Sequence, residues 1–109
     1  MGFLELFRGK PALVEGAGEI AEGHARRVEI GDKLLVLCRV EGRLHALDAS
    51  CPHEGGRISE GPLLDGKHAM CPLHNYRFDP RTGAAVGVVC GSARTYRVRE
   101  KGGDCEVWT

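Results

Sequence analysis

Apolar and polar residues alternate over short stretches of this chain, and turn residues separate the stretches. Val28 and Ile30 alternate with charged residues, which is the two-residue period of a β-strand that buries one face. The longest apolar run, residues 34–38, is rich in β-formers and lies between turn residues. No stretch of helical periodicity exceeds three turns. The pattern therefore predicts an all-β fold.

Several of these stretches form pairs around turn signals. Residues 33–48 are predicted to form a hairpin around a Glu-Gly turn, and residues 95–108 another around Gly-Gly-Asp. Residues 63–70 repeat the scheme around Asp-Gly, and residues 79–83 carry a further strong turn signal. About eight to ten short strands at this spacing are typical of a small antiparallel β-sandwich or open barrel.

The length of 109 residues allows one domain. Residues 1–24 are rich in glycine, alanine and glutamate toward their end and are expected to be an irregular lead-in. Residues 25–109 are expected to form the domain itself.

Charge and targeting signals narrow the possible functions. The 15 basic and 15 acidic residues balance, which argues against a nucleic-acid binder held by a basic face. The longest apolar run is too short to span a membrane. The N-terminal residues lack the basic start and long apolar core of a signal peptide, so a cytoplasmic protein is expected.

The chemistry of the chain is concentrated in two short segments. Cys51 and His53 are separated by one proline, and Cys71 and His74 by Pro-Leu. Four such ligands fit either a tetrahedral zinc site or a 2Fe–2S cluster with two cysteines on one iron and two histidines on the other. The common Cys₂His₂ zinc modules place the two cysteines together and the two histidines together. The alternating order here favours the iron–sulfur cluster.

The pattern C-x-H, seventeen residues, C-x-x-H resembles the Rieske signature, and the likeness continues into the residues after each pair and covers roughly residues 25–108. The resemblance implies a Rieske-type antiparallel β-sandwich with two cluster-binding loops on hairpin ends. It also implies one 2Fe–2S cluster, with Cys51 and Cys71 on one iron and His53 and His74 on the other.

Four positions place the chain within the family. High-potential Rieske proteins carry two further cysteines that bridge the cluster loops, at positions that correspond to Gly56 and Leu73 here. They also carry hydroxyl donors at the positions of Tyr76 and Phe78. Phe78 has no hydroxyl, and Tyr76 is a much longer side chain than the usual serine. Fewer hydrogen bonds to the sulfurs stabilise the reduced state less, so a potential at the low end of the Rieske range is expected.

The resemblance to the small Rieske proteins implies a ferredoxin-type, one-electron carrier rather than a catalyst on its own. Its expected partners are a flavin-dependent NAD(P)H reductase and a terminal oxygenase or nitrite reductase, with no nucleic-acid or membrane partner, and a monomer is expected. The alternative is the small subunit of an assimilatory NADH-dependent nitrite reductase. More remote alternatives are a zinc-binding interaction module and a cluster-based redox sensor.

The remaining cysteines, histidines and basic residues are interpreted as structural. Cys38 and Cys105 are expected in the core, and Cys90 in a loop near the cluster. Six Arg and Lys against two acids in residues 77–101 are interpreted as the solvated face of strands, with steering of an acidic partner as the alternative. Three histidines without a neighbouring cysteine are expected on surfaces or strand faces: His24, His45 and His68.

Overall fold

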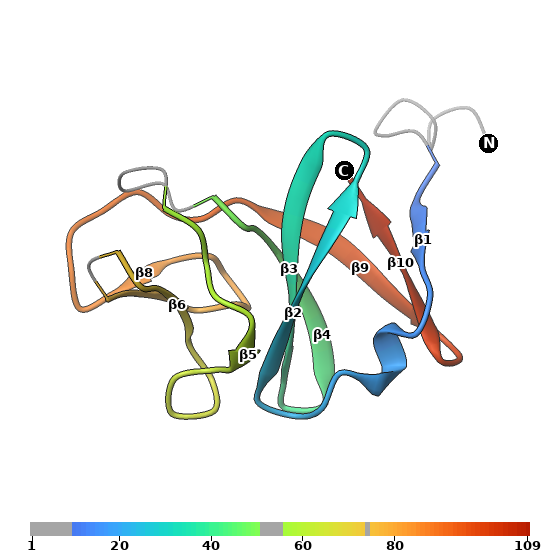
Figure 1. The fold of residues 1–109 in the computed structure, drawn as a ribbon, viewed down its shortest axis with the longest axis horizontal. Helices are drawn as coiled ribbons and strands as arrows, with labels where there is room; N and C mark the ends of the chain where they lie inside the picture. Colours follow the sequence, from blue (N-terminus) through green and yellow to red (C-terminus); the bar gives the residue numbers. More distant parts are fainter. Residues whose placement is uncertain (1–9, 51–55, 74) are drawn as a thin grey trace.

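A computed structural model describes residues 10–50, 56–73 and 75–109. Over these residues the chain forms ten strands and one short 3₁₀ turn, in two antiparallel sheets (Figure 1). The seven-stranded sheet has the order β1-β10-β9-β4-β3-β2-β5, and the three-stranded sheet has the order β6-β7-β8. The elements are β1 (Ala12–Val14), η1 (Ala17–Glu19), β2 (His24–Ile30), β3 (Lys33–Val40), β4 (Arg43–Asp48), β5 (Gly61–Pro62), β6 (Ala69–Cys71), β7 (Tyr76–Phe78), β8 (Ala85–Val86), β9 (Thr95–Lys101) and β10 (Asp104–Trp108).

The central strand β3 is buried on both faces. Leu35 and Leu37 belong to one apolar cluster, whereas Val36 and Cys38 belong to the other, and all four are 0% exposed. Successive side chains of a strand point to opposite faces, so an unbroken apolar run is required here. This explains why residues 34–38 lack the alternation seen in β2.

One apolar cluster lies beneath β9, β10 and β1. Strand β10 pairs with β1 and β9, and Cys105 and Val107 of β10 are fully buried there. Ala17 and Ile20, on and beside the 3₁₀ turn, are buried in the same cluster. Residues 10–24 therefore differ from the irregular lead-in that we expected, because they contribute a strand and core side chains.

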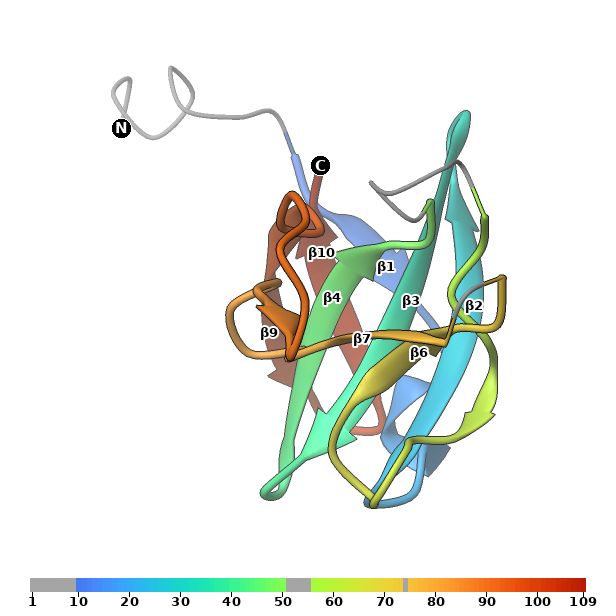
Figure 2. The same ribbon diagram turned by 90° about the vertical axis from the view of Figure 1, so that its left-hand side faces the viewer.

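The other apolar cluster lies between the central strands and the three-stranded sheet. Figures 1 and 2 show β6 and β7 on the side of β2–β4 that faces away from β10. Phe78 of β7 is 0% exposed, and Ile58 and Cys71 are buried beside it in this cluster. The small sheet thus packs on a rigid support, and its strand β6 ends at a predicted metal ligand.

The turn at residues 79–83 connects β7 to β8. It is also hydrogen-bonded to the segment that precedes β9. The amide of Arg81 donates to the Asp79 carboxylate at 2.9 Å, and the amide of Gly83 donates to the Asp79 carbonyl at 2.6 Å. The amide of Ala93 then donates to the Gly83 carbonyl at 2.7 Å. Gly83 has φ of 82°, in the left-handed region that favours glycine.

The predicted all-β antiparallel class is confirmed, and so are the hairpins of residues 33–48 and 95–108. Among the described residues no helix is long and apolar enough to cross a membrane.

Replacing Gly83 by alanine should destabilise the fold by about 3 kcal/mol or more. The added Cβ would collide with the carbonyl oxygen of Ala93 and would lie 3.1 Å from Cγ2 of Thr95. Gly42→Ala is the matched control, because Gly42 has φ of 80° and no atom within 4 Å of the added Cβ. The control should lose only about 1 kcal/mol. Urea unfolding of both variants measures the difference, and equal losses would refute the steric argument.

Candidate metal centre

Of the four predicted ligands, the structure describes Cys71. Cys51, His53 and His74 lie outside the described residues. Within the described ranges no three His, Cys, Asp or Glu side chains form a group that could hold a metal ion. The set of four ligands therefore stays a prediction, and the structure describes Cys71 and the residues that anchor the two loops.

Cys71 is the last residue of β6, where the second loop begins. Its side chain is 1% exposed and belongs to the apolar cluster under the small sheet. Cys71 pairs with Tyr76 of β7, so the connection between them contains four residues. Asn75 at its end has φ of 58°, a conformation that asparagine tolerates better than most residues. The thiol thus lies at the end of a strand that is paired over its whole length with β7.

The first loop is anchored at both of its ends. Ser50 and Arg57 form an antiparallel bridge, and the amide of Ile58 donates to the carbonyl of Ala49 at 2.8 Å. The amide of Ser59 donates to the carbonyl of Met70 at 2.9 Å, which joins this segment to β6. Cys51 and His53 lie in the sequence between these anchors.

The end of the first loop touches the start of the second. A Cβ on Gly56 would lie 2.7 Å from Sγ of Cys71 and 3.2 Å from Cβ of Leu73. Only a residue without a side chain permits this approach. The segments that carry the two predicted Cys/His pairs therefore meet at a buried thiol, which fits a group bound by both loops. From the sequence, Gly56 was identified as the position of a bridging cysteine in other Rieske proteins, and its contact with the Cys71 thiol was not predicted because no pattern in the chain encodes it.

The positions of the expected hydroxyl donors are occupied by aromatic side chains. Tyr76 is half-buried and lies beside Cys71 across the strand pair. Phe78 is fully buried in the apolar cluster and has no hydroxyl to donate. Gly56 and Leu73 are adjacent, as the positions of the bridging cysteines in other members require, but neither can form a disulfide. These replacements remain the physical basis for expecting a low potential.

The other described cysteines differ in their surroundings. Cys38 is 0% exposed, and burial raises the pKa of its thiol to about 12. Cys105 is also 0% exposed, and burial followed by the nearby Glu100 raises its pKa. The prediction that both lie in the core is confirmed. Cys90 is half-buried and packs against the cluster that contains Cys71, and its Sγ lies 3.3 Å from the carbonyl oxygen of Gly91.

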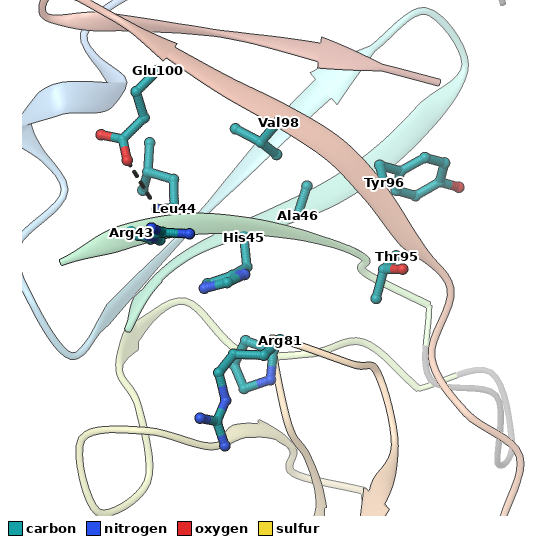
Figure 3. A pocket seen from close by; sticks show the side chains of 10 residues that line it. Arg43, Leu44, His45, Ala46, Arg81, Thr95, Tyr96, Val98 and Glu100 are labelled. Carbon is teal, nitrogen blue, oxygen red and sulfur yellow. Dashed lines mark hydrogen bonds between the residues drawn. The ribbon is translucent and has the colours of Figure 1, made fainter. Parts of the chain in front are cut away.

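The histidines outside the motif lie at three different places in the fold. His24 is exposed at the start of β2, and His68 is half-buried between β5 and β6. Among the described residues Nδ1 of His68 finds no hydrogen-bond partner. His45 faces the turn of residues 79–83 across a groove of about 360 Å³ (Figure 3). Burial, then the positive charges of Arg81 and Arg43, lower the pKa of His45, so it is neutral at pH 7.

The chain is similar to proteins of a known family. The profile described as Rieske [2Fe-2S] domain matches residues 10–97, most of the chain. The chain belongs to this family. The family assignment implies one Rieske-type 2Fe–2S cluster, so the prediction of this cofactor is confirmed and the zinc alternative is not supported.

Relatives and solved structures specify the branch of the family. The ferredoxin component of the naphthalene 1,2-dioxygenase system of Pseudomonas aeruginosa is 41% identical over 85 residues, which are 77% of this chain and 81% of the relative. The ferredoxin in a complex of reduced oxygenase and oxidised ferredoxin of carbazole 1,9a-dioxygenase matches with a TM-score of 0.78 and 30% identity, over 90% of this chain and 92% of that one. These relatives confirm the resemblance to Rieske ferredoxins.

The small subunit of a nitrite reductase shares the fold. The structure described as the NADH-dependent nitrite reductase small subunit of Mycobacterium tuberculosis matches with a TM-score of 0.67 over 91% of this chain and 96% of that one. The TM-score is evidence for a common fold, and because the identity is only 19% the match carries no argument about activity.

Gly56→Ala should lower the amount of cluster in the purified protein several-fold while the β-fold persists. The reason is that the new Cβ would lie within 3.3 Å of Cys71 Sγ and of two atoms of Leu73. Gly103→Ala is the matched control, because a Cβ there meets nothing within 4 Å. Iron and acid-labile sulfide per chain, together with circular dichroism, measure the outcome. Full cluster content in the Gly56 variant would contradict the close approach.

Thiol alkylation at pH 8 should modify Cys90 and leave the two core cysteines unmodified. Only the thiolate reacts, and a pKa of about 12 leaves roughly one Cys38 thiol in 10⁴ ionised at that pH. Raising the pH by one unit raises this fraction about tenfold. The cluster should protect Cys51 and Cys71. Mass spectrometry of the alkylated peptides identifies the sites, and modification of Cys38 as fast as Cys90 would show that the core thiol is accessible.

Proposed function

We propose that this chain is the ferredoxin component of a ring-hydroxylating dioxygenase system. It would take one electron from a flavin-dependent NAD(P)H reductase and deliver it to a terminal oxygenase. The proposal rests on the 41% identity to a dioxygenase ferredoxin. The buried Cys71 thiol at the place where the two loops meet supports it. A role inside a nitrite reductase is less well supported, because that likeness rests on the fold alone.

The proposed ligands are Cys51 and Cys71 for one iron and His53 and His74 for the other. The donor set supports this assignment, since two thiolates and two neutral imidazoles suit a 2Fe–2S cluster of the Rieske type. When bound, the cluster accepts and releases one electron at a time. Two neutral ligands in place of two thiolates leave the oxidised centre without net charge, which favours reduction over that of an all-cysteine cluster.

The protein around the site would supply rigidity and a dry environment. Cys71 is held at a strand end within an apolar cluster, so its thiolate is shielded from water on that side. The two anchored loop ends would hold the ligand loops without a disulfide, because Gly56 packs directly against Cys71 and Leu73. We also propose that the protein works in the cytoplasm, where a pyridine-nucleotide-dependent reductase would supply the electron.

Protein purified in air should contain about two iron and two acid-labile sulfide per chain. His74→Cys should retain iron but lower the reduction potential by about 100 mV or more, because a thiolate replaces a neutral imidazole. Potentiometric titration followed by EPR measures both proteins. His24→Cys, at an exposed strand start, is the matched control and should leave the potential unchanged. A colourless protein with one zinc, or equal potentials in the two variants, would overturn the assignment.

A further inference from the structure

A group of cations stacked on aromatic rings lies at the start of β9 and the end of β10. We call Lys33, Arg94, Tyr96, Arg97 and Trp108 the basic patch. Nζ of Lys33 lies 5.6 Å and Cζ of Arg94 5.4 Å from the centre of the Tyr96 ring. Cζ of Arg97 lies 4.9 Å from the centre of the Trp108 ring. Such stacking limits the freedom of long side chains before a partner arrives.

The cations of the basic patch are not neutralised by the rest of the described chain. Lys33, Arg94 and Arg97 form no ion pair with another described residue, whereas Arg99 nearby is paired with Glu106 at 2.6 Å. Arg94, Tyr96, Arg97 and Trp108 line a shallow groove of about 280 Å³, and none of its described lining residues is acidic.

Two carboxylates lie close to the basic patch. The Asp48 carboxylate accepts hydrogen bonds from the amide of Ser50 at 2.9 Å and from the Tyr96 hydroxyl at 3.3 Å, so both of its oxygens are engaged. Asp32 is exposed in the turn next to Lys33. The three cations therefore leave a local excess of positive charge.

The basic patch adjoins the anchor of the first loop. The amide of Asp48, at the end of β4, donates to the carbonyl of Arg94 at 2.8 Å, and Ser50 follows two residues later. In Figures 1 and 2 the end of β4 and the C-terminus lie toward the upper end of the molecule. The turns at residues 41–42 and 65–66 lie at the opposite end in both views.

That opposite end carries a small excess of carboxylates, although Arg81 pairs there with Glu41 and Asp79. A groove of about 280 Å³ there is lined by two cations and by four carboxylates, namely Glu22, Glu41, Asp65 and Asp79. The chain has no net charge, but the cations of the basic patch and the excess carboxylates of this groove lie toward opposite ends of the molecule, top and bottom in Figure 1. A redox partner with a carboxylate-rich surface would be oriented with that surface toward the end that carries the basic patch.

We propose that the basic patch is the docking surface for a redox partner whose contact face is rich in carboxylates. The inference rests on the proposed electron-carrier function and adds the charge of the partner. Steering by such a patch raises the association rate at low salt more than it raises final affinity. Arg94 and Arg97, two of the six Arg and Lys in residues 77–101, thus acquire a role beyond solvation of strand faces.

The test uses the cluster-containing protein, reduced with dithionite, and two acceptor proteins of opposite charge. Cytochrome b5 serves as the acidic acceptor and cytochrome c as the basic one, each followed by stopped-flow spectroscopy. At low ionic strength Arg97→Glu should slow reduction of cytochrome b5 about tenfold and speed reduction of cytochrome c, with Arg97→Gln in between. These differences in rate should vanish at about 0.5 M salt, where the Debye length is only a few ångströms.

Lys67→Glu is the matched control, because it changes the net charge equally at the opposite end. It should change either rate less than twofold. Calorimetric titration of the oxidised proteins, in which no electron moves, should show the same order of affinities for cytochrome b5. Equal effects of the Arg97 and Lys67 reversals, or none, would overturn the docking surface while leaving the electron carrier intact. A wild-type protein that accepts no electron from dithionite would instead overturn the proposed function and the inference with it.

Discussion

Burial of both faces of β3 is the constraint on which the rest of this structure depends. Leu35 and Leu37 face β9, β10 and the 3₁₀ turn, while Val36 and Cys38 face the small sheet. A chain of 109 residues has little interior to spare, and a strand shared by two apolar clusters uses it efficiently. Because β3 contributes side chains to both apolar clusters, the small sheet that carries Cys71 packs on the same strand as β9 and β10.

The ends of the two loops that carry the predicted ligands are held by contacts among the described residues on this support. Ser50 and Arg57 close the first loop, β6 and β7 frame the second, and Gly56 brings the first loop against Cys71. High-potential Rieske proteins have a disulfide between the positions of Gly56 and Leu73. In this chain there is no disulfide at these positions. Close packing of Gly56 against Cys71 and Leu73 holds the two loop ends together instead.

The distribution of charged residues over the surface is a second feature of the structure. The total is zero, but the acidic groove near Asp65 and Asp79 and the basic patch near Arg94 and Arg97 lie at opposite ends. Long-range forces between proteins depend on such separation rather than on the sum. A carrier that must meet two partners in succession benefits from orientation during each encounter, since its complexes have to form and dissociate quickly.

Local patterns in the sequence were enough to predict the all-β class, the hairpins around Glu41-Gly42 and Gly102-Gly103, and the core positions of Cys38 and Cys105. Alternation and turn residues act over a few positions, so they can be identified without a fold. The two Cys/His pairs left a zinc site and a 2Fe–2S cluster open, and their alternating order together with the resemblance to the Rieske signature predicted the cluster. The strand at residues 12–14 was missed, because it exists through pairing with β10, almost a hundred residues away. The approach of Gly56 to Cys71 and the separation of charge were decided only in three dimensions, because both arise from residues that are distant in the chain and meet only when the sheets pack.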